Sequence, residues 1–323
     1  MNGTVIQTRT IDMGILEAGE GPLVLLCHGF PETGHAWRHQ VEALARAGYR
    51  VIAPDLRGYG ESGSPGRADQ YTVFHAVGDL VALMDALGET QAVVVGNDWG
   101  ATIAWQAALM RPDRFRAVVA LTVPMMGIPP VPPSRIFPED EEALFYVLYF
   151  QEPDGAEVEF GRDVRSTLRK LIFAASGEAG PRKPGDGTPN PFGMVARSQG
   201  LLAGLPDPAA LPPWLSSEDF ERLVAAFEAS GFTGGLNYYR NLDRNWELQQ
   251  ANVGQTVGVP ALFMIGDRDP GLAIPGMEKI IADMPSLVPK LVGSHVLPGA
   301  GHWLQQERPD EVSQLILGFL RKL

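Results

Sequence analysis

The 323-residue chain has a single cysteine, Cys27, so it cannot form an internal disulfide. Its longest unbroken apolar run, residues 143–150, is far shorter than the roughly 20 residues that a membrane-spanning helix needs. The first residues lack the basic and apolar regions of a secretory signal. Basic residues are also scarce: 26 Lys and Arg face 38 Asp and Glu, and the net charge of −12 repels phosphate backbones. We therefore expect a cytoplasmic protein that binds no nucleic acid and does not insert into membranes.

Short, mainly apolar runs alternate with segments of helical apolar spacing. The runs predict strands at residues 23–27, 51–53, 92–95, 115–123, 259–265 and 295–297. The spacing predicts helices over residues 37–47, 73–87, 101–110, 276–284 and 309–320. Strands that are apolar on both faces and separated by helices indicate a parallel sheet covered on both sides, which is an α/β fold.

A cluster of prolines between residues 129 and 138 interrupts this alternation. Beyond it the patterns are helical, over residues 139–151, 157–175, 217–230 and 236–246, with a Pro- and Gly-rich surface loop expected at 180–191. We therefore expect residues 1–125 and 250–323 to form an α/β core domain. Residues 126–249 are expected to form a helical cap, or lid, inserted into that core.

Asp98 lies where a predicted buried strand turns into a helix, among the small residues Gly96, Gly100 and Ala101. Such a turn is typical of a nucleophile elbow, in which small neighbours permit a strained backbone and one side chain is lifted into a pocket. The alternative is an aspartate that only caps the helix. No G-x-S-x-G motif is present and Cys27 lies within its strand, so the pattern favours a carboxylate nucleophile.

An attacking carboxylate forms an ester, and its hydrolysis needs a base for water, commonly a histidine oriented by an acid. His302 follows the last predicted strand on a glycine-rich loop, and Asp269 follows the strand before it. Asp98, Asp269 and His302 therefore occur in the nucleophile–acid–histidine order of α/β hydrolases. Asp267 competes with Asp269 for the place of the acid, but we expect it in a local turn.

Two further motifs suggest a metal or a nucleotide, and neither is complete. His35 and His39 have the i, i+4 spacing of zinc ligands, but Ala36 stands where the zinc-protease motif has glutamate. Residues 58–63 match G-x-G-x-x-G, yet the motif stands apart from its strand and no helix follows it. We therefore expect no metal, no nicotinamide and no other cofactor.

Four stretches together resemble the epoxide hydrolases of the α/β-hydrolase superfamily, and the similarity extends nearly from end to end. They are residues 28–33 (HGFPET), 55–62 (DLRGYGES), 98–100 (DWG) and 301–303 (GHW). The resemblance implies an α/β-hydrolase fold with a mostly parallel eight-stranded sheet. It also implies an oxyanion hole made by the backbone N–H groups of Phe30 and Trp99, with a Phe30–Pro31 bond that is often cis. Asn97 departs from the pattern, because many relatives have histidine at that position.

The resemblance further implies two cap tyrosines that grip the epoxide oxygen. One precedes a Phe-Gln-Glu-Pro-like stretch, here residues 150–153, and the similarity favours Tyr146 over Tyr149. The other is matched to Tyr239, and the neighbouring Tyr238 faces elsewhere because adjacent helical residues point about 100° apart. The substrate pocket is expected to be walled by Phe30, Pro31, Trp99, Tyr149 and Trp303.

Taken as a whole, the resemblance implies an enzyme that converts an epoxide and water to a vicinal diol through an ester on Asp98. We expect a monomer or homodimer. A haloalkane or fluoroacetate dehalogenase uses the same aspartate nucleophile and is the nearest alternative. The haloalkane enzymes would place asparagine where Phe30 stands, and the fluoroacetate enzymes place arginine where Trp99 stands. A more distant alternative is a ligand-binding protein that kept the fold and lost catalysis.

Overall fold

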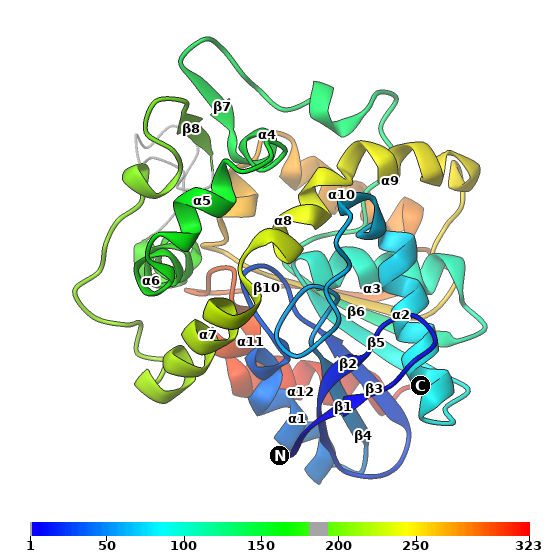
Figure 1. The fold of residues 1–323 in the computed structure, drawn as a ribbon. Helices are drawn as coiled ribbons and strands as arrows, with labels where there is room; N and C mark the ends of the chain where they lie inside the picture. The colour runs from blue at the N-terminus through cyan, green and yellow to red at the C-terminus, as the bar shows by residue number, and fades with distance from the viewer. Residues whose placement is uncertain (1, 181–192) are drawn as a thin grey trace.

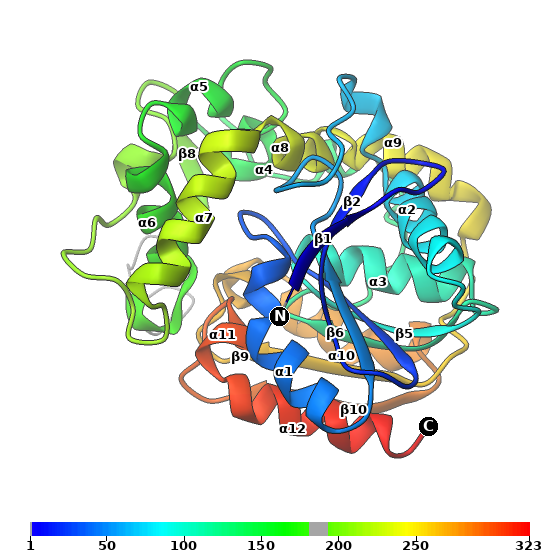
Figure 2. The same cartoon turned by 60° about the horizontal axis from the view of Figure 1, so that its bottom comes forward.

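The computed structural model describes residues 2–180 and 193–323, which contain an eight-stranded sheet (Figures 1 and 2). The strands are β1 Asn2–Ile6, β2 Met13–Ala18, β3 Leu23–Cys27, β4 Arg50–Pro54, β5 Ala92–Asn97, β6 Phe115–Leu121, β9 Ala261–Gly266 and β10 Leu291–Leu297. Their order in the sheet is β1-β2-β4-β3-β5-β6-β9-β10. All pairs from β4 to β10 are parallel, and only β1–β2 and β2–β4 are antiparallel. The predicted mostly parallel sheet of an α/β-hydrolase fold is thereby confirmed.

Alternate residues of a strand point to opposite sides of the sheet, and an apolar core lies on each side. The helices that flank it are α1 Arg38–Arg46, α2 Val73–Ala86, α3 Trp99–Met110, α10 Met277–Leu287, α11 Leu304–Glu307 and α12 Pro309–Leu320. In β3, Leu25 and Cys27 belong to the apolar core shared with α2 and α3. Val24 and Leu26 belong to the core shared with α1 and α12, which lie side by side below the sheet in Figure 2.

The core elements agree with their predicted bounds to within a few residues, apart from the first two strands. β1 and β2 carry no apolar run, since β2 is buried only in its first half and β1 pairs with β2 alone at the edge of the sheet. Apolar periodicity therefore gave no signal for them. Within the described residues, no helix has the length and apolarity needed to cross a membrane.

Between β6 and β9 the chain leaves the sheet and forms the elements along the left side and across the top of Figure 1, which we call the inserted segment (residues 126–249). Its main elements are β7 Ala143–Phe145, α4 Tyr146–Tyr149, α5 Ala156–Gly161, α6 Val164–Ala175, β8 Met194–Ala196, α7 Ser217–Ser230, α8 Thr233–Arg240 and α9 Leu242–Gln249. Helix α7 has the predicted bounds. The division of the chain into core and cap domains at these boundaries stays a prediction.

The helix predicted over residues 139–151 is wrong for most of its length. Residues 143–145 form β7, which pairs with β8 in an antiparallel two-stranded sheet, and only the four residues of α4 are α-helical. The apolar residues here satisfy strand and helix patterns equally, and the pairing partner lies about 50 residues further along the chain. The loop predicted at 180–191 falls outside the described residues except for residue 180.

Two other predicted helices are each divided in two. The segment 157–175 breaks where Asp163 caps α6, its carboxylate accepting a hydrogen bond of 2.9 Å from the N–H of Ser166. The segment 236–246 breaks at Asn241, whose Nδ2 donates to the carbonyl of Asn237 and, across the chain, to that of Ala68. In both cases a polar side chain competes with the helical hydrogen bonds.

The first turn of α3 lies so close to β3 that only glycine fits at position 100. A Cβ on Gly100 would overlap the carbonyl oxygens of Cys27 and His28. Gly100→Ala should therefore lower the free energy of unfolding by about 3 kcal/mol, measured by urea denaturation. Gly78→Ala, in the middle of α2 with no atom near its Cβ position, is the control and should raise that free energy by up to about 1 kcal/mol. Equal effects of the two changes would contradict the packing argument.

Candidate active site

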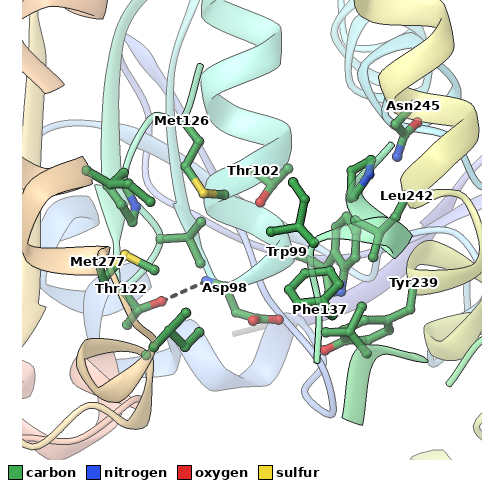
Figure 3. A pocket seen from close by; sticks show the side chains of 18 of the residues that line it. Asp98, Trp99, Thr102, Thr122, Met126, Phe137, Tyr239, Leu242, Asn245 and Met277 are labelled. Atoms are coloured by element: carbon green, nitrogen blue, oxygen red, sulfur yellow. Dashed lines mark hydrogen bonds between the residues drawn. The ribbon is translucent and has the colours of Figure 1, made fainter. Parts of the chain in front are cut away.

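Asp98 occupies a strained turn between β5 and α3. Its backbone angles of φ 54° and ψ −120° lie in a region that side chains other than glycine rarely adopt. The turn depends on Gly96, because a Cβ there would overlap the backbone of Gly100. The N–H of Asp98 donates to Oγ1 of Thr122 over 3.2 Å, which fixes the turn from β6 (dashed line in Figure 3). The strain thus holds the carboxylate of Asp98 out of the sheet and into a cavity.

The carboxylate of Asp98 does not cap α3, since it accepts no hydrogen bond from the first amides of that helix. It accepts one instead from the N–H of Phe30 over 2.9 Å. The Phe30–Pro31 peptide bond is cis, as the resemblance implied. Trp99 opens α3 directly after the carboxylate and lines the same cavity. The helix-cap alternative is therefore not realised, and the two expected oxyanion-hole residues flank Asp98.

The structure brings Asp98, Asp269 and His302 together at the carboxyl ends of β5, β9 and β10. His302 Nδ1 lies 3.0 Å from Oδ2 of Asp269, and its Nε2 lies 3.4 Å from Oδ2 of Asp98. Asp269 is almost fully buried, and its Oδ1 also accepts the N–H of Gly271 over 2.7 Å. The imidazole is therefore oriented by Asp269 and presents its other nitrogen to Asp98.

The electrostatic surroundings of His302 favour its charged form. Burial by itself would lower the pKa of His302, but the neighbouring carboxylates of Asp269 and Asp98 outweigh burial and hold this pKa well above 6.5. His302 thus gains charge stabilisation from two carboxylates, one of which is the candidate nucleophile. Its basicity is consequently tied to the charge on Asp98.

Tyr146 from α4 and Tyr239 from α8 line the same cavity as Asp98, with ring centroids 6.2 Å apart. Figure 3 shows the hydroxyl of Tyr239 pointing toward the carboxylate of Asp98. Burial, followed by the charge of Asp98, raises the pKa of both phenols. Both therefore stay neutral and can donate hydrogen bonds into the cavity.

Two residues expected in the pocket wall do not line the cavity. Tyr149 turns to α5, where its hydroxyl donates to Oε2 of Glu159 over 2.8 Å. Pro31 belongs to a turn closed by a hydrogen bond from the N–H of Glu32 to the carbonyl of Gly29, so Phe30 alone of this turn faces the cavity. Phe30, Trp99 and Trp303 all line the cavity, and their contact with a substrate stays a prediction. Tyr238 is buried elsewhere and donates to the carbonyl of Arg57 over 3.2 Å.

The cavity has a volume of about 520 Å³, which falls in the range of small-molecule sites. Apolar and aromatic side chains from both the core and the inserted segment make up most of its wall. The charged side chains among the lining residues are Asp98, Asp269 and His302. The site is thus an apolar chamber with its charges gathered at one end.

The motifs that suggested a metal or a nucleotide have other roles. Nε2 of His35 lies 2.6 Å from Oδ1 of Asp219, so its partner is a single carboxylate. No group of three candidate ligands occurs in residues 2–180 and 193–323. Residues 58–63 close on themselves, with the N–H of Gly58 donating to the carbonyl of Gly63, and no phosphate loop forms.

Glu307 supports the loop that carries His302, a role that the sequence did not reveal. Its buried carboxylate accepts the N–H groups of Gly301 at 2.8 Å and Trp303 at 3.0 Å, one residue on either side of His302. The N–H of Gly177, which follows α6 of the inserted segment, donates to the same carboxylate over 2.9 Å. In sequence, Glu307 is one of several acids near the start of a helix, and nothing there distinguishes it.

Glu32 is a second buried carboxylate near the site. The side chains of Gln305 and Gln306 donate to it over 2.8 to 3.1 Å. Burial, only partly offset by the hydrogen bond from Gln306, raises its pKa from 4.5 to about 7. Glu32 follows the His-Gly-Phe-Pro stretch directly, so this shifted group lies beside the turn that holds the N–H of Phe30.

The chain is similar in sequence and structure to known proteins. Residues 22–152 match the model of the alpha/beta hydrolase fold family. Epoxide hydrolase A of Mycobacterium tuberculosis is 42% identical over 322 residues, which cover 99% of this chain and 97% of that protein. Epoxide hydrolase 2 of Siraitia grosvenorii is 41% identical over 326 residues, covering 99% and 98%. A solved epoxide hydrolase from an endophytic Streptomyces superimposes with a TM-score of 0.93 at 41% identity, over 99% of this chain and 95% of that one.

The sheet, the elbow at Asp98 and the histidine after the last strand define an enzyme of the α/β-hydrolase fold. Within that class, identity of about 40% over nearly the whole chain is decisive. The chain belongs to the epoxide hydrolase family.

The raised pKa of Glu32 predicts a pH-dependent stability. Because the pKa is about 7 when folded and near 4.5 when unfolded, the folded state binds more protons between these values, so this group lowers stability as pH rises through the window. Relative to Glu32→Gln, which cannot ionise, the native protein should lose about 3 kcal/mol of unfolding free energy between pH 4.5 and 8. Urea unfolding of both proteins across this range measures the difference. A difference in unfolding free energy between the two proteins that does not change with pH would contradict the raised pKa of Glu32.

Proposed function

We propose that this protein hydrolyses epoxides to vicinal diols through a covalent ester on Asp98. The observation that supports this most directly is that two neutral phenols, Tyr146 and Tyr239, line the same apolar cavity as the carboxylate of Asp98 and feel its charge. A carboxylate attacks the oxirane carbon, and phenols receive the oxygen that departs from it. The names of the relatives, which are epoxide hydrolases, support the same substrate class.

In the first step an oxygen of Asp98 forms a bond to one oxirane carbon while that carbon's bond to the ring oxygen breaks. Ring strain already makes the carbon electrophilic, so the protein has to align the attack and stabilise the alkoxide. Tyr146 and Tyr239 donate hydrogen bonds to the ring oxygen, and one of them supplies its proton. The inserted segment acts in this proposal as a cap that carries both donors.

In the second step water attacks the ester carbonyl of Asp98 and neutral His302 takes one of its protons. The tetrahedral intermediate then collapses, the bond between the carbonyl carbon and the diol oxygen breaks, and His302 returns that proton to the departing oxygen. The proton left on the regenerated Asp98 carboxyl passes to His302, which restores the starting state. Esterification removes the negative charge of Asp98, which is one of the influences that raise the pKa of His302. The imidazolium can therefore pass its proton more easily to the phenolate left by the first step, and the neutral imidazole then serves as the base. Asp269 keeps the ring oriented, and the N–H groups of Phe30 and Trp99 bind the oxyanion.

A dehalogenase would use the same ester and differ in the leaving group. A departing halide needs donors, but it accepts no proton from a phenol at neutral pH, so the paired tyrosines serve an alkoxide better. Asparagine and arginine, the residues that mark the two dehalogenase types, are absent at positions 30 and 99, where Phe30 and Trp99 stand. Halide release is accordingly an outcome that the activity assay should include.

The first prediction of this proposal concerns the intermediate. His302→Gln should still form the ester but hydrolyse it slowly, because the base is lost while Asp98 is retained. With styrene oxide, intact-mass spectrometry should show an adduct of one substrate mass, and peptide mapping should place it on Asp98. The native protein should release diol under the same conditions, and chlorinated analogues should release no halide. Diol formation by the variant at the native rate, or an adduct on another residue, would refute the mechanism.

The second prediction concerns the phenols. Tyr146→Phe and Tyr239→Phe should each slow ester formation by about 10²-fold, since each removes one hydrogen-bond donor to the developing alkoxide. Stopped-flow measurement of ester formation under single-turnover conditions separates this step from hydrolysis. Tyr149→Phe is the matched control, because its hydroxyl binds Glu159 outside the cavity, and it should stay within a few-fold of native. If Tyr149→Phe slowed ester formation more than the other two changes, the assignment of Tyr146 and Tyr239 as the donors would be wrong.

A further inference from the structure

Helix α3 extends from Asp98 along the wall of the cavity and carries polar side chains away from the catalytic end. Thr102 and Gln106 are four residues apart on one face of α3, and both line the cavity. Figure 3 shows Thr102 and Met126 lying further along the cavity from Asp98. Gln106 is eight residues beyond Asp98, which corresponds to roughly 12 Å along the helix axis. Gln106 therefore marks the end of the cavity remote from the ester-forming carboxylate.

The carboxamide oxygen of Gln106 is buried without a hydrogen-bond partner among the described residues. The residue is 8% exposed, and its Oε1 has no hydrogen bond to any atom of the described residues. Buried polar groups in native proteins are nearly always paired, so this one calls for a partner from outside the chain. A carboxamide can both accept and donate, and rotation by 180° exchanges the two functions. Gln106 can thus bind a hydroxyl or an amide equally well.

The charge of this end of the cavity restricts the partner further. The charged residues among the cavity's lining, Asp98, Asp269 and His302, all belong to the catalytic end, and no Lys or Arg is among the lining residues. A carboxylate held near Gln106 would be removed from water without a cation to pair with it, which is unfavourable. A neutral polar group meets no such penalty. The site therefore favours neutral over anionic chains.

A second cavity also borders Gln106. A second cavity of about 200 Å³ adjoins the first and shares with it the side chains of Gln106, Met126, Ile128 and Gln249. It continues toward Val253, which is exposed at the surface after α9. Gln106 thus borders both cavities, at the end of the first one that is remote from Asp98.

We propose that Gln106 is a specificity-determining residue that hydrogen-bonds a neutral polar group, a hydroxyl or carboxamide, on the chain of the epoxide. That group lies roughly 12 Å from the oxirane, the distance set by two turns of α3. The inference rests on the proposed epoxide hydrolysis and names the substrate class within it: long, mainly apolar epoxides with a neutral hydrogen-bonding end. It excludes carboxylate-ended chains as preferred substrates.

The test uses straight-chain terminal epoxides of stepped length whose far end is methyl, hydroxyl, carboxamide or carboxylate. In the native protein, diol formation should show a kcat/KM about tenfold higher for the hydroxyl and carboxamide chains than for the methyl chain of the same length. The preference should appear only for chains long enough to reach Gln106, and it should reside in KM, because the contact is equal in ground and transition states. The carboxylate chain should fall below the methyl chain.

Two variants of Gln106 identify the side chain responsible. Gln106→Met keeps the length of the side chain without its hydrogen-bonding atoms and should bring the ratio of hydroxyl to methyl chain to about one. Gln106→Glu keeps an acceptor and should retain the hydroxyl preference while it disfavours the carboxylate chain further. Gln199→Met, at an exposed position of the inserted segment, is the control and should keep the native ratios. Thermal unfolding of each variant confirms that it is folded.

The outcomes separate this inference from the proposed function. Diol formed from the methyl-ended chain, with no preference for polar ends or with a preference that survives Gln106→Met, overturns the role of Gln106 and leaves epoxide hydrolysis standing. A native preference for the carboxylate chain overturns the inference as well. No diol from any chain refutes the proposed function itself.

Discussion

The site depends on keeping two carboxylates and one imidazole in contact inside a chamber that is otherwise apolar. Asp98 and Asp269 lie on either side of His302, at 3.4 and 3.0 Å, and each stabilises the charged imidazole against the cost of burial. Their separation is set by the parallel sheet, because β5, β9 and β10 end at the same edge. A shift of one strand would separate the pair of charges and leave a buried carboxylate without its partner.

Much of this could be predicted from the sequence, because the core elements carry strong local signals. The all-apolar runs fix the parallel strands, and small residues around Asp98 can be recognised as an elbow without any structure. The order of Asp98, Asp269 and His302 then follows from which strand each residue terminates. These signals are local in the chain. Because the strands are parallel, the three residues at their carboxyl ends lie close together at one edge of the sheet.

The rest depends on contacts that no local pattern records. The pairing of β7 with β8 joins residues about 50 positions apart, and apolar spacing alone made this segment a helix. Tyr149 has the same chemistry as Tyr146, but its hydroxyl donates to Glu159 and it does not line the cavity. Glu307 and Glu32 matter because they are buried, and a charged residue in sequence is most simply interpreted as exposed.

The position of the inserted segment relative to Asp98 is set by the loop that carries His302. The N–H of His302 donates to the carbonyl of Ala175 at 2.9 Å, and the indole of Trp303 donates to that of Ile172 at 2.8 Å, both at the end of α6. Glu307 adds a third link through Gly177. The same short loop therefore positions His302 beside Asp98 and binds the inserted segment, which carries Tyr146 and Tyr239. The two proposed steps consequently depend on the conformation of this one loop.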